Sequence, residues 1–479
     1  MKAERSAALL GPFVAVAVLG VCIALSAANV RAASFSWLAY MLANLIVHTD
    51  TLDLLLRLHV RRRHVAAVRR SSEATRHLSI DIAKPFPDGA RHIEPTRPYA
   101  IIASVFNLHN HLDDFIAAFE PYRRYVWIIS DGSTDLTVQR LRQEGWRCID
   151  GRVNRRKPGA LRTLLEELPA PIETVLVVDP DTRICDPQNG SAVDLEQVVR
   201  DFQQSGAAAA CPRVTLERDG FLSRFQTLEY ALSFGAGKQS LADYSITSGV
   251  SLYRRDALEQ ALAAHSLSVY AEDLENALIL LSRGERIYYD GRLVLCTEGP
   301  GSWGRWFSQR VGWYYGLIKV YAERLSEIRR IAKRTPFAMY HFVVYTGLLL
   351  LVWHLVKMAS AALLLASVVG GFDSLLLGDL IPTNALTNPV YFVSAIAGYV
   401  VLGVLALFTV VPKQERLYVA PIVPLYLGYA VAHIAPMSVG FANWFALKLF
   451  GRRLYRDHYE PSDRRVKPSA SIPQEEQAS

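Results

Sequence analysis

The chain has 479 residues, 51% of them hydrophobic, and carries a formal net charge of +7. This length leaves room for one soluble domain of ordinary size and for a second part of another kind. The excess of Lys and Arg lies mainly beside long uncharged runs, which argues against nucleic-acid binding and for basic segments that face a lipid surface.

Residues 1–57 are predicted to form a transmembrane hairpin. Uncharged runs extend over 6–30 and 32–49, and each is long enough to cross a bilayer as a helix. A cleaved signal peptide is the alternative for the first run, but no small-residue cleavage site is followed by soluble sequence. The basic stretch RLHVRRRHVAAVRR then begins a basic cytoplasmic linker, which is predicted over 58–97.

Three further apolar stretches, at 337–369, 389–412 and 417–450, predict a C-terminal transmembrane bundle over 337–450. The last stretch is either one span or a span followed by an interfacial helix. Lys and Arg flank the spans at 57–70 and in the basic tail at 451–479, whereas the loop at 370–388 has neither. Because cytoplasmic loops carry the excess of Lys and Arg, residues 57–336 are expected in the cytoplasm. The end of the tail is polar and is expected to be disordered.

Residues 98–300 alternate short apolar runs with segments of helical length. Strands are predicted at 99–106, 125–130, 174–179 and 207–214, and helices at 136–145 and 159–168. Such alternation predicts an α/β domain with a mostly parallel sheet, inserted between the two transmembrane parts. No G-x-G-x-x-G or P-loop motif follows a strand, so the Rossmann and P-loop alternatives lack their phosphate-binding loop. The five cysteines form no C-x-x-C pair, so neither a disulfide nor a zinc site is expected.

Carboxylates follow two of these strands, at the sheet edge where open α/β sheets bind ligands. Asp131 follows the second predicted strand, and Asp179 and Asp181 end the run VLVVDPD. Residues i and i+2 of an extended chain point to the same side, so these two carboxylates repel each other unless a cation lies between them. A hard divalent cation, shared with substrate phosphates, is the expected partner. By itself Asp-x-Asp is a weak signal, because surface loops produce it by chance.

A series of motifs follows in one order along the chain: SDGSTD, RRKPGAL, DPD, TSGVSLYRRDAL, AEDLENAL and QRVGW. This series resembles the membrane-embedded family-2 glycosyltransferases, the group that includes cellulose, chitin, hyaluronan and poly-N-acetylglucosamine synthases. The resemblance covers nearly the whole chain. It implies a GT-A-type nucleotide-sugar domain at 98–300 and interfacial amphipathic helices at 301–336, which carry QRVGW. The basic amphipathic segment at 317–334 is expected to lie on the inner leaflet.

For the sugar donor, the resemblance implies four binding residues. Asp131 would contact the nucleotide base, and Lys157 the nucleotide and its diphosphate. Asp179 and Asp181 would hold Mg²⁺ or Mn²⁺ against the diphosphate of a UDP-sugar. An inverting transfer needs such positive charge to stabilise the departing diphosphate. Lys157 could instead be an ordinary surface lysine in a basic run.

For the acceptor, the resemblance implies that Asp273 is the general base that deprotonates the acceptor hydroxyl, with Glu272 beside it. Gln309, Arg310 and Trp313 would contact the diphosphate and the acceptor sugar, since a tryptophan face suits a pyranose ring. The ordinary alternatives are acids at a helix N-terminus and an interfacial helix with an aromatic anchor.

The sequence departs from the family pattern at two places. Gly312 stands where the family has an arginine before the tryptophan, which puts diphosphate stabilisation and long-polymer synthesis in question. In VFNLHNH, the acidic partner usual near Asn107 is missing or shifted to Asp113 and Asp114. His109 and His111 have metal-ligand spacing, but loop histidines near a helix start are commoner, so no metal is expected there.

The expected function is an inverting glycosyltransferase of the inner membrane that adds a hexose or N-acetylhexosamine from a UDP-sugar to a β-linked polysaccharide. The expected partners are the UDP-sugar, a glycan or lipid acceptor and the lipid bilayer, with no nucleic acid. One alternative is a single transfer to a lipid acceptor, which Gly312 and the modest number of spans favour. The other is a catalytically inactive subunit of a polysaccharide export complex.

Overall fold

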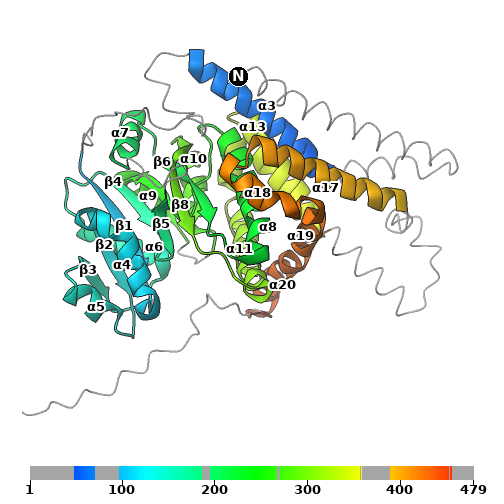
Figure 1. Ribbon diagram of the computed structural model, residues 1–479. Coiled ribbons are helices and arrows are strands. Elements are labelled where there is room, and N and C mark those ends of the chain that lie inside the picture. The colour runs from blue at the N-terminus through cyan, green and yellow to red at the C-terminus, as the bar shows by residue number, and fades with distance from the viewer. Residues whose placement is uncertain are drawn as a thin grey trace, which may run out of the picture.

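The computed structural model describes residues 48–70, 97–185, 195–266, 270–355, 358, 389–452 and 454–455. Most of the predicted N-terminal hairpin, most of the linker, the loop at 370–388 and most of the C-terminal tail lie outside the described residues. In the described part, an α/β domain lies beside a layer of long helices (Figure 1).

The α/β domain is built on an eight-stranded sheet with the order β3-β2-β1-β4-β7-β6-β8-β5. Its strands are β1 (Tyr99–Val105), β2 (Val126–Asp131), β3 (Cys148–Gly151), β4 (Thr174–Val178), β5 (Thr182–Cys185), β6 (Ala209–Leu216), β7 (Ser251–Arg254) and β8 (Ile287–Thr297). Strands β3, β2, β1 and β4 are mutually parallel, as are β6 and β8. The pairs β4–β7, β6–β7 and β5–β8 are antiparallel. The mostly parallel sheet is therefore confirmed, with antiparallel insertions that were not predicted.

Two apolar cores cover the two faces of this sheet. Alternate residues of a strand point to opposite faces, so Ile101 and Ala103 of β1 join one core while Ala100 and Ile102 join the other. Helices α6 (Arg156–Glu167), α9 (Arg255–Ala264) and α10 (Glu272–Ser282) contribute to the second core, and α4 (Leu112–Phe119) and α7 (Leu195–Ser205) to the first. The helices expected at 136–145 and 159–168 are present as α5 (Thr137–Gln143) and α6.

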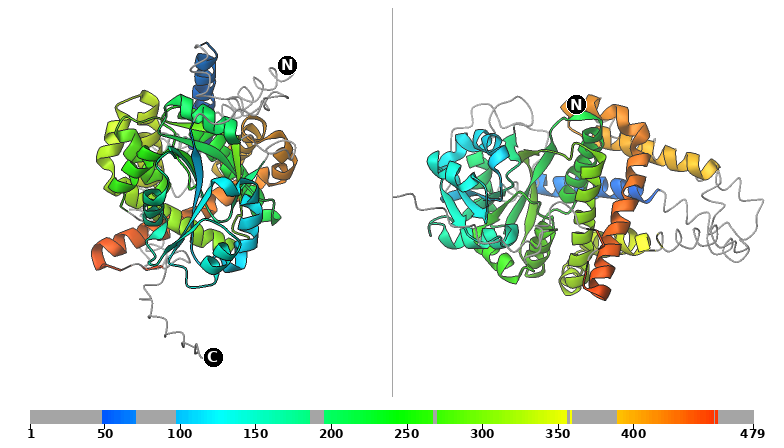
Figure 2. Two further views of the ribbon diagram at one scale, coloured as in Figure 1. Left: turned by 90° about the vertical axis from the view of Figure 1, so that its left-hand side faces the viewer. Right: turned by 90° about the horizontal axis from the view of Figure 1, so that it is seen from below.

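The helical layer combines segments that are far apart in the sequence. It contains α3 (Thr49–Arg70), α8 (Gly220–Tyr230), the π-helical turn η4 (Ala231–Lys238), α11 (Trp303–Glu323), α12 (Leu325–Ala332), α13 (Pro336–Met339), η5 (Tyr340–Val352), α17 (Pro389–Thr409), η6 (Lys413–Glu415), α18 (Arg416–Val419), η7 (Ala420–Leu425), α19 (Tyr426–Ala432) and α20 (Ile434–Phe450). A third apolar core joins Leu54, Phe225, Leu405 and Tyr429. Helices α11 and α20 lie side by side (Figure 2).

Two described helical segments, Pro336–Leu355 and Lys413–Phe450, are long and apolar enough to cross a membrane. They overlap the spans predicted at 337–369 and 417–450, and Ile396–Thr409 is a shorter apolar helix within the stretch predicted at 389–412. Core helices of soluble proteins pass the same test of length and composition, so the transmembrane bundle remains a prediction.

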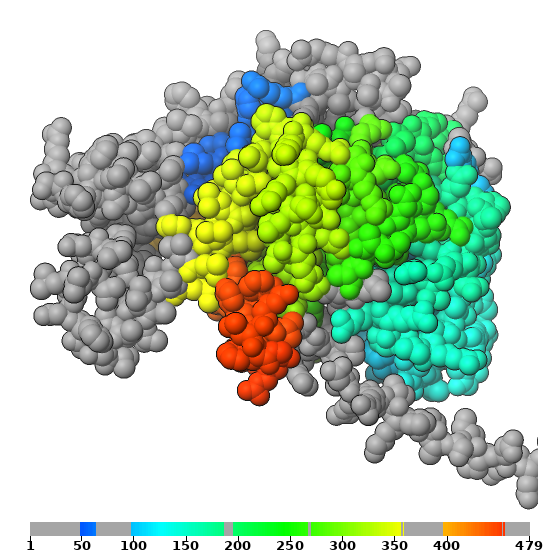
Figure 3. Space-filling view, turned by 180° about the vertical axis from the view of Figure 1, so that it is seen from behind, coloured from blue at the N-terminus to red at the C-terminus, as the bar shows by residue number. Residues whose placement is uncertain are grey.

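The amphipathic segment expected on the inner leaflet is two helices, because α11 ends and α12 begins around Arg324. Ile328 and Ile331 of α12 are 3% and 0% exposed and belong to the same core as α10. The apolar face of α12 therefore contacts protein rather than lipid, because α10 needs cover for its own apolar side chains. Leu325 remains 51% exposed. In Figure 3 the yellow and yellow-green segment lies beside the green part of the molecule, with the C-terminal helix (red) below it.

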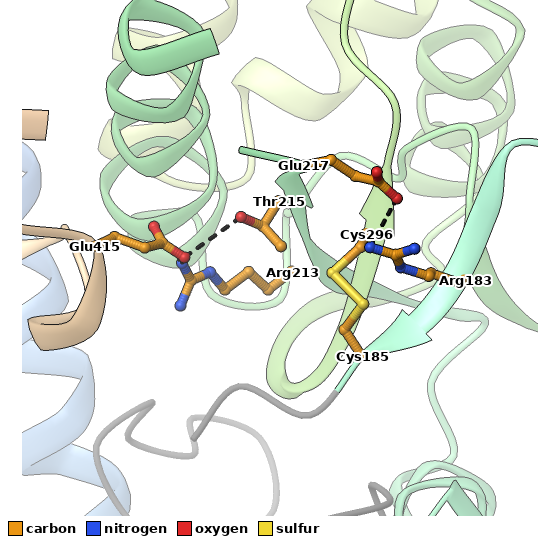
Figure 4. The surroundings of a disulfide bond; sticks show 7 residues. All are labelled: Arg183, Cys185, Arg213, Thr215, Glu217, Cys296 and Glu415. Carbon is orange, nitrogen blue, oxygen red and sulfur yellow. Dashed lines mark hydrogen bonds and ion pairs between the residues drawn. A yellow bond between two sulfur atoms is a disulfide. The ribbon is translucent and has the colours of Figure 1, made fainter. Parts of the chain in front are cut away.

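A disulfide joins Cys185 and Cys296, and the expectation of no disulfide was wrong (Figure 4). Strand β5 pairs antiparallel with β8, which places the two Cα atoms 5.9 Å apart across a sequence separation of 111 residues. Cysteine spacing carries no signal for this neighbourhood, because only the strand order creates it. Cys148 and Cys211 are free cysteines.

An ion pair near the disulfide joins the sheet to the C-terminal helices (Figure 4). Arg213 of β6 donates to both carboxylate oxygens of Glu415 in η6, at 3.0 and 3.2 Å, and Thr215 donates to the same carboxylate at 3.4 Å. The Arg213 and Glu415 side chains are 9% and 14% exposed. The helical layer is thus attached to the sheet by a shielded polar contact as well as by apolar packing.

Replacing Arg292 with leucine is expected to lower the free energy of unfolding by about 3–5 kcal/mol, because it removes the cation between two buried carboxylates. Arg292 contacts Asp201 at 2.5 Å and Asp290 at 2.7 Å, and these aspartates are 4% and 2% exposed. Urea-induced unfolding followed by tryptophan fluorescence measures the change. Arg97→Leu is the control, because Arg97 and its partner Glu173 are 63% and 50% exposed. This substitution should lower the free energy of unfolding by about 1 kcal/mol or less. Equal losses in the two variants would contradict the burial argument.

Candidate functional site

Asp131 lies at the carboxyl end of β2, where the loop DGSTD begins. The residue is 4% exposed, and its Oδ1 accepts a hydrogen bond from the backbone N–H of Arg155 at 2.6 Å. Burial raises the pKa of Asp131, and the backbone N–H groups of Arg155 and Arg156 oppose this rise. Gly132 has φ +75°, and a Cβ there would lie 2.7 Å from the backbone N of Asn154. Asp131 therefore fixes the end of β2 against the loop that leads into α6.

The loop after β1 does not bring an acidic side chain from Asp113 to this edge. Asn107 accepts a hydrogen bond from the backbone N–H of Thr134 at 2.8 Å and so holds this loop against DGSTD. Asp113 pairs with Arg140 at 2.6 Å, and its side chain is 82% exposed. The Asn107 amide and the Asp135 carboxylate, which accepts from the backbone N–H of His109 at 3.0 Å, thus connect the two loops.

Lys157, in the first turn of α6, joins three of the motifs. Its Nζ lies 2.5 Å from Asp179 Oδ1, 2.7 Å from the carbonyl oxygen of Gly249 and 3.3 Å from Glu272 Oε1. Burial alone would lower the pKa of Lys157, but the carboxylates of Asp179 and Glu272 outweigh burial and hold it above its ordinary value. A Cβ on Gly249 would lie 2.8 Å from Asp179 Oδ2, so the TSGV motif needs glycine here. The charged Lys157 ammonium is the centre of the site.

Asp179 and Asp181 occupy the turn between β4 and β5. The Asp179 carbonyl accepts from the backbone N–H of Thr182 at 3.1 Å, and Asp181 Oδ2 accepts from the hydroxyl of Thr297 at 3.1 Å. The Asp181 side chain reaches solvent, but surrounding protein limits its hydration. This burial, with the nearby negative charge of Asp179, raises the pKa of Asp181 to about 6. Two carboxylates that disfavour each other's charge are a suitable place for a cation.

The residues at this turn fit a divalent metal ion that is shared with a substrate. Asp179 and Asp181 offer hard oxygen ligands, as Mg²⁺ and Mn²⁺ prefer. Among the described residues, no group of three or more His, Cys, Asp or Glu side chains could hold a metal by itself. A cation here would therefore take its other ligands from water and from phosphate oxygens. That arrangement is usual for Mg²⁺ at phosphate-binding sites.

Glu272 and Asp273 form the first turn of α10, which follows Ala271 with φ +57°. Burial raises the pKa of Glu272 to about 7, although Lys157 opposes the rise. The Asp273 carbonyl accepts from the hydroxyl of Thr247 at 2.8 Å, and its Oδ1 accepts from the backbone N–H of Leu274 at 2.8 Å. Glu272 thus forms an ion pair with Lys157, while the Asp273 carboxylate lies at the N-terminus of α10, the positive end of the helix dipole.

Arg310 and Trp313 lie on α11 and form a stacked pair. Arg310 Cζ lies 4.0 Å from the centre of the Trp313 ring, and its Nη2 donates to Glu229 at 2.7 Å. Gln309 accepts from Arg310 Nη1 at 3.1 Å. Arg310 is 1% exposed, whereas Trp313 is 42% exposed. Glu229 on α8 therefore holds Arg310 beneath a tryptophan whose outer face is open, and this acid was not predicted because it lies 81 residues away in the sequence.

Tyr230, next to Glu229, connects this stacked pair with the aspartates. Burial raises the pKa of Tyr230, the positive charge of Arg310 opposes this rise, and the negative charges of Glu229 and Asp181 add to it. A tyrosine in an apolar helical run gives no sequence signal for such a position. The contacts of Lys157 thus bring the KPG, DPD, TSGV and AED motifs together, and Tyr230 lies within the electrostatic reach of both Asp181 and Arg310 of QRVGW.

The sequence profile of glycosyl transferase family group 2 matches residues 174–430, more than half of the chain. The fold is similar to that of a mannosyltransferase from Pyrobaculum calidifontis, solved with GDP-Man and Mn²⁺, at 16% identity and a TM-score of 0.42, over 83% of this chain and 99% of that chain. Glucosyl-3-phosphoglycerate synthase from Mycobacterium tuberculosis, solved with Mn²⁺ and UDP-Glc, matches at 15% identity and a TM-score of 0.32, over 47% and 79%. Mannosyl-3-phosphoglycerate synthase from Rubrobacter xylanophilus matches at 14% identity and a TM-score of 0.31, over 49% and 75%. On the strength of the profile match, the chain belongs to glycosyl transferase family group 2 and is a glycosyltransferase.

Proposed function

We propose that the protein is an inverting, metal-dependent glycosyltransferase that elongates a β-linked polysaccharide from a UDP-sugar at the cytoplasmic face of the cell membrane. The sugar is a hexose or an N-acetylhexosamine. The observation that carries this proposal is the position of the Lys157 ammonium, 2.5 Å from Asp179 and 3.3 Å from Glu272. It joins the residues proposed for diphosphate binding to the turn proposed for proton removal.

The donor half of the reaction uses the first group of residues. Asp131 orients the nucleotide, and Asp179 and Asp181 hold Mg²⁺ or Mn²⁺. Such a cation stabilises the charge on the departing diphosphate. The Lys157 ammonium adds a second positive charge beside the same group. Because these charges are fixed before the reaction, the protein does not need to reorganise when the leaving group separates.

The acceptor half uses Asp273 and Trp313. The exposed face of Trp313 stacks against the acceptor sugar, and Arg310, held by Glu229, keeps the ring in place. Asp273 takes the proton of the acceptor hydroxyl while the oxygen of that hydroxyl forms a bond to the anomeric carbon of the donor sugar. The bond from that carbon to the diphosphate oxygen breaks at the same time, and UDP leaves. Attack from the face opposite the leaving group inverts the configuration.

The proposed membrane arrangement places residues 1–57 and 337–450 in the bilayer, with the helices at 301–336 and the catalytic domain 98–300 on the basic, cytoplasmic side. Two described candidate spans support it, as do the long uncharged runs and their basic flanks. A hydrogen bond from the Trp306 Nε1–H to the Tyr429 hydroxyl, at 2.9 Å, joins α11 to the candidate span at Lys413–Phe450. An acceptor on Trp313 would thus start beside the proposed transmembrane bundle.

The test uses membranes that contain the full-length protein, Mg²⁺ and radiolabelled UDP-glucose, UDP-N-acetylglucosamine, UDP-galactose or GDP-mannose in turn. A ladder of labelled glycans from one UDP-sugar is the expected result. Label confined to a small chloroform-soluble product would replace elongation by single transfer to a lipid. Label from GDP-mannose alone would reject the UDP-sugar. The absence of label from every donor would overturn the proposal and favour an inactive subunit.

Removing divalent metal ions is expected to lower the transfer rate by a factor on the order of 10³, because the diphosphate would leave without its cation. The measurement compares membranes treated with EDTA and the same membranes resupplied with Mg²⁺ or Mn²⁺. Recovery on resupply, but not with Na⁺ at equal ionic strength, is the control for damage by the chelator. An undiminished rate in EDTA would contradict the metal role of Asp179 and Asp181.

A further inference from the structure

Two glycines of α11 form a slot that holds Tyr270. A Cβ on Gly312 would lie 2.5 Å from Cε1, 2.9 Å from Cζ and 3.0 Å from Cδ1 of the Tyr270 ring. A Cβ on Gly316, one turn later, would lie 2.7 Å from Tyr270 Cβ, 2.8 Å from its backbone C and 3.0 Å from Ala271 Cβ. Tyr270 is 7% exposed. Gly312 thus receives the ring, and Gly316 receives the backbone that follows it.

The slot lies directly before the turn that carries the two carboxylates. Ala271 follows Tyr270 with φ +57° and ψ +32°, a left-handed conformation that alanine adopts only when its surroundings hold it there. Glu272 and Asp273 come next, so the direction of both side chains depends on this residue. Contact with Gly316 on one side restricts how Tyr270 and Ala271 can relax.

The same turn is held on its other side by the loop that leads into β7. Lys238, the last residue of η4, donates to the carbonyl of Thr247 at 2.9 Å, and the Thr247 hydroxyl donates to the carbonyl of Asp273 at 2.8 Å. The backbone at Asp273 is therefore attached to TSGV, and the backbone at Tyr270 is attached to α11. The segment Tyr270–Asp273 is therefore held at both of its ends.

We propose that Tyr270 is a positioning residue, which locks the Glu272–Asp273 turn to α11 so that the proton acceptor keeps a fixed place relative to Trp313. This inference rests on the proposed function, because it assumes that Asp273 removes a proton from an acceptor bound at Trp313. Trp313 follows Gly312 directly. The helix α11, which is proposed to bind the acceptor, therefore also contacts Tyr270, which is proposed to position Asp273. Gly312 has a function of its own here: a larger residue at this position would displace the Tyr270 ring.

The test is a set of variants assayed for kcat, for the KM of the sugar donor and for the ratio of transfer to hydrolysis of that donor. Gly312→Ala should lower kcat on the order of 100-fold, because displacement of a catalytic group by about 1 Å has an effect of this size. The KM of the sugar donor should rise far less than kcat falls, because Asp131, Asp179 and Asp181 keep their places and only the contact of Glu272 with Lys157 is shifted. Transfer should fall more than hydrolysis, because water needs no alignment with Trp313.

Tyr270→Leu keeps an apolar side chain but removes Cε1 and Cζ, the two ring atoms closest to a Cβ on Gly312. Alone it should lower kcat by about tenfold, and the double variant with Gly312→Ala should match it instead of falling further. Gly316→Ala is the matched control for the partial recovery of kcat in this double variant. Its added Cβ would contact the Cβ and backbone of residue 270, which leucine retains. Adding Tyr270→Leu to Gly316→Ala should therefore not restore any kcat. Gly304→Ala, on the same helix with nothing within 4 Å of its Cβ, should behave as the parent.

Parent-like kcat in Tyr270→Leu, measured with an active parent chain, would overturn this inference and leave the proposed function standing. A fall of kcat in Gly312→Ala that Tyr270→Leu does not relieve would also overturn this inference. The same holds if the KM of the sugar donor in Gly312→Ala rises in proportion as kcat falls. A parent chain that is inactive with every sugar donor would instead overturn the proposed function and this inference with it.

Discussion

Asp273→Asn is expected to lower the rate of sugar transfer by a factor on the order of 10³, because an amide cannot accept the proton of the acceptor hydroxyl. The substitution is close to isosteric, and the hydrogen bond from Thr247 goes to the backbone carbonyl of Asp273, which the variant keeps. Donor binding should therefore be unaffected. Single-turnover transfer at saturating UDP-sugar measures the chemical step, and the KM of the sugar donor reports on binding.

Glu272→Gln is the comparison that separates the two acids of this turn. The Glu272 carboxylate lies 3.3 Å from the Lys157 ammonium, so its loss should disturb the diphosphate half of the site and raise the KM of the sugar donor. Asp273→Asn should change kcat and leave that KM alone. The opposite pattern, in which Glu272→Gln abolishes the chemical step and Asp273→Asn is tolerated, would transfer the role of base to Glu272.

The donor half of the site was accessible to sequence reasoning because it depends on local rules. A buried strand followed by Asp-x-Asp places Asp179 and Asp181 in the turn after β4, and the same rule places Asp131 at the end of β2. Glu272 and Asp273 have no such rule. They were predicted from the order of motifs, and only the fold shows that Lys157 contacts both Glu272 and Asp179.

What the sequence did not predict depends on neighbours that are distant in the chain. Glu229 becomes important only because α8 packs near α11, and the Cys185–Cys296 bond exists only because β8 lies between β6 and β5. Gly312 is the clearest case. In the sequence it is a missing arginine, whereas in the fold its Cβ position is taken by the Tyr270 ring.

The antiparallel strands were missed for a related reason. Strands β5 and β7 have only four residues each, and β5 follows β4 without the helical crossover that marks parallel pairs. They therefore look like loops in a sequence. The helix α12 was recognised as amphipathic, but its apolar face was expected on lipid and instead contacts protein. Apolar periodicity shows that a face is covered, but not whether lipid or protein covers it.

Lys157→Met is expected to lower transfer by a factor on the order of 10²–10³ and to raise the KM of the sugar donor, since it removes a fixed positive charge from the diphosphate half of the site. Methionine preserves much of the side-chain volume, so the loss reports on charge. The change leaves Asp179 and Glu272 close together without their shared cation, and the carbonyl of Gly249 without this donor. The stability loss should be smaller than that of Arg292→Leu, because the Asp179 side chain is 35% exposed and can be hydrated.

Two further variants of α6 separate charge from geometry in this experiment. Arg162→Met removes a cation from the same helix, but Arg162 and its partner Glu166 are 54% and 66% exposed, so transfer should stay at the parent rate. Lys157→Arg keeps the charge, but the planar guanidinium cannot reproduce a single ammonium shared by two carboxylates and a carbonyl. Its rate should fall between those of the parent and Lys157→Met. If Lys157→Met transfers sugar at the parent rate, the ammonium is only a structural contact, and the convergence of motifs on Lys157 no longer supports the proposed chemistry.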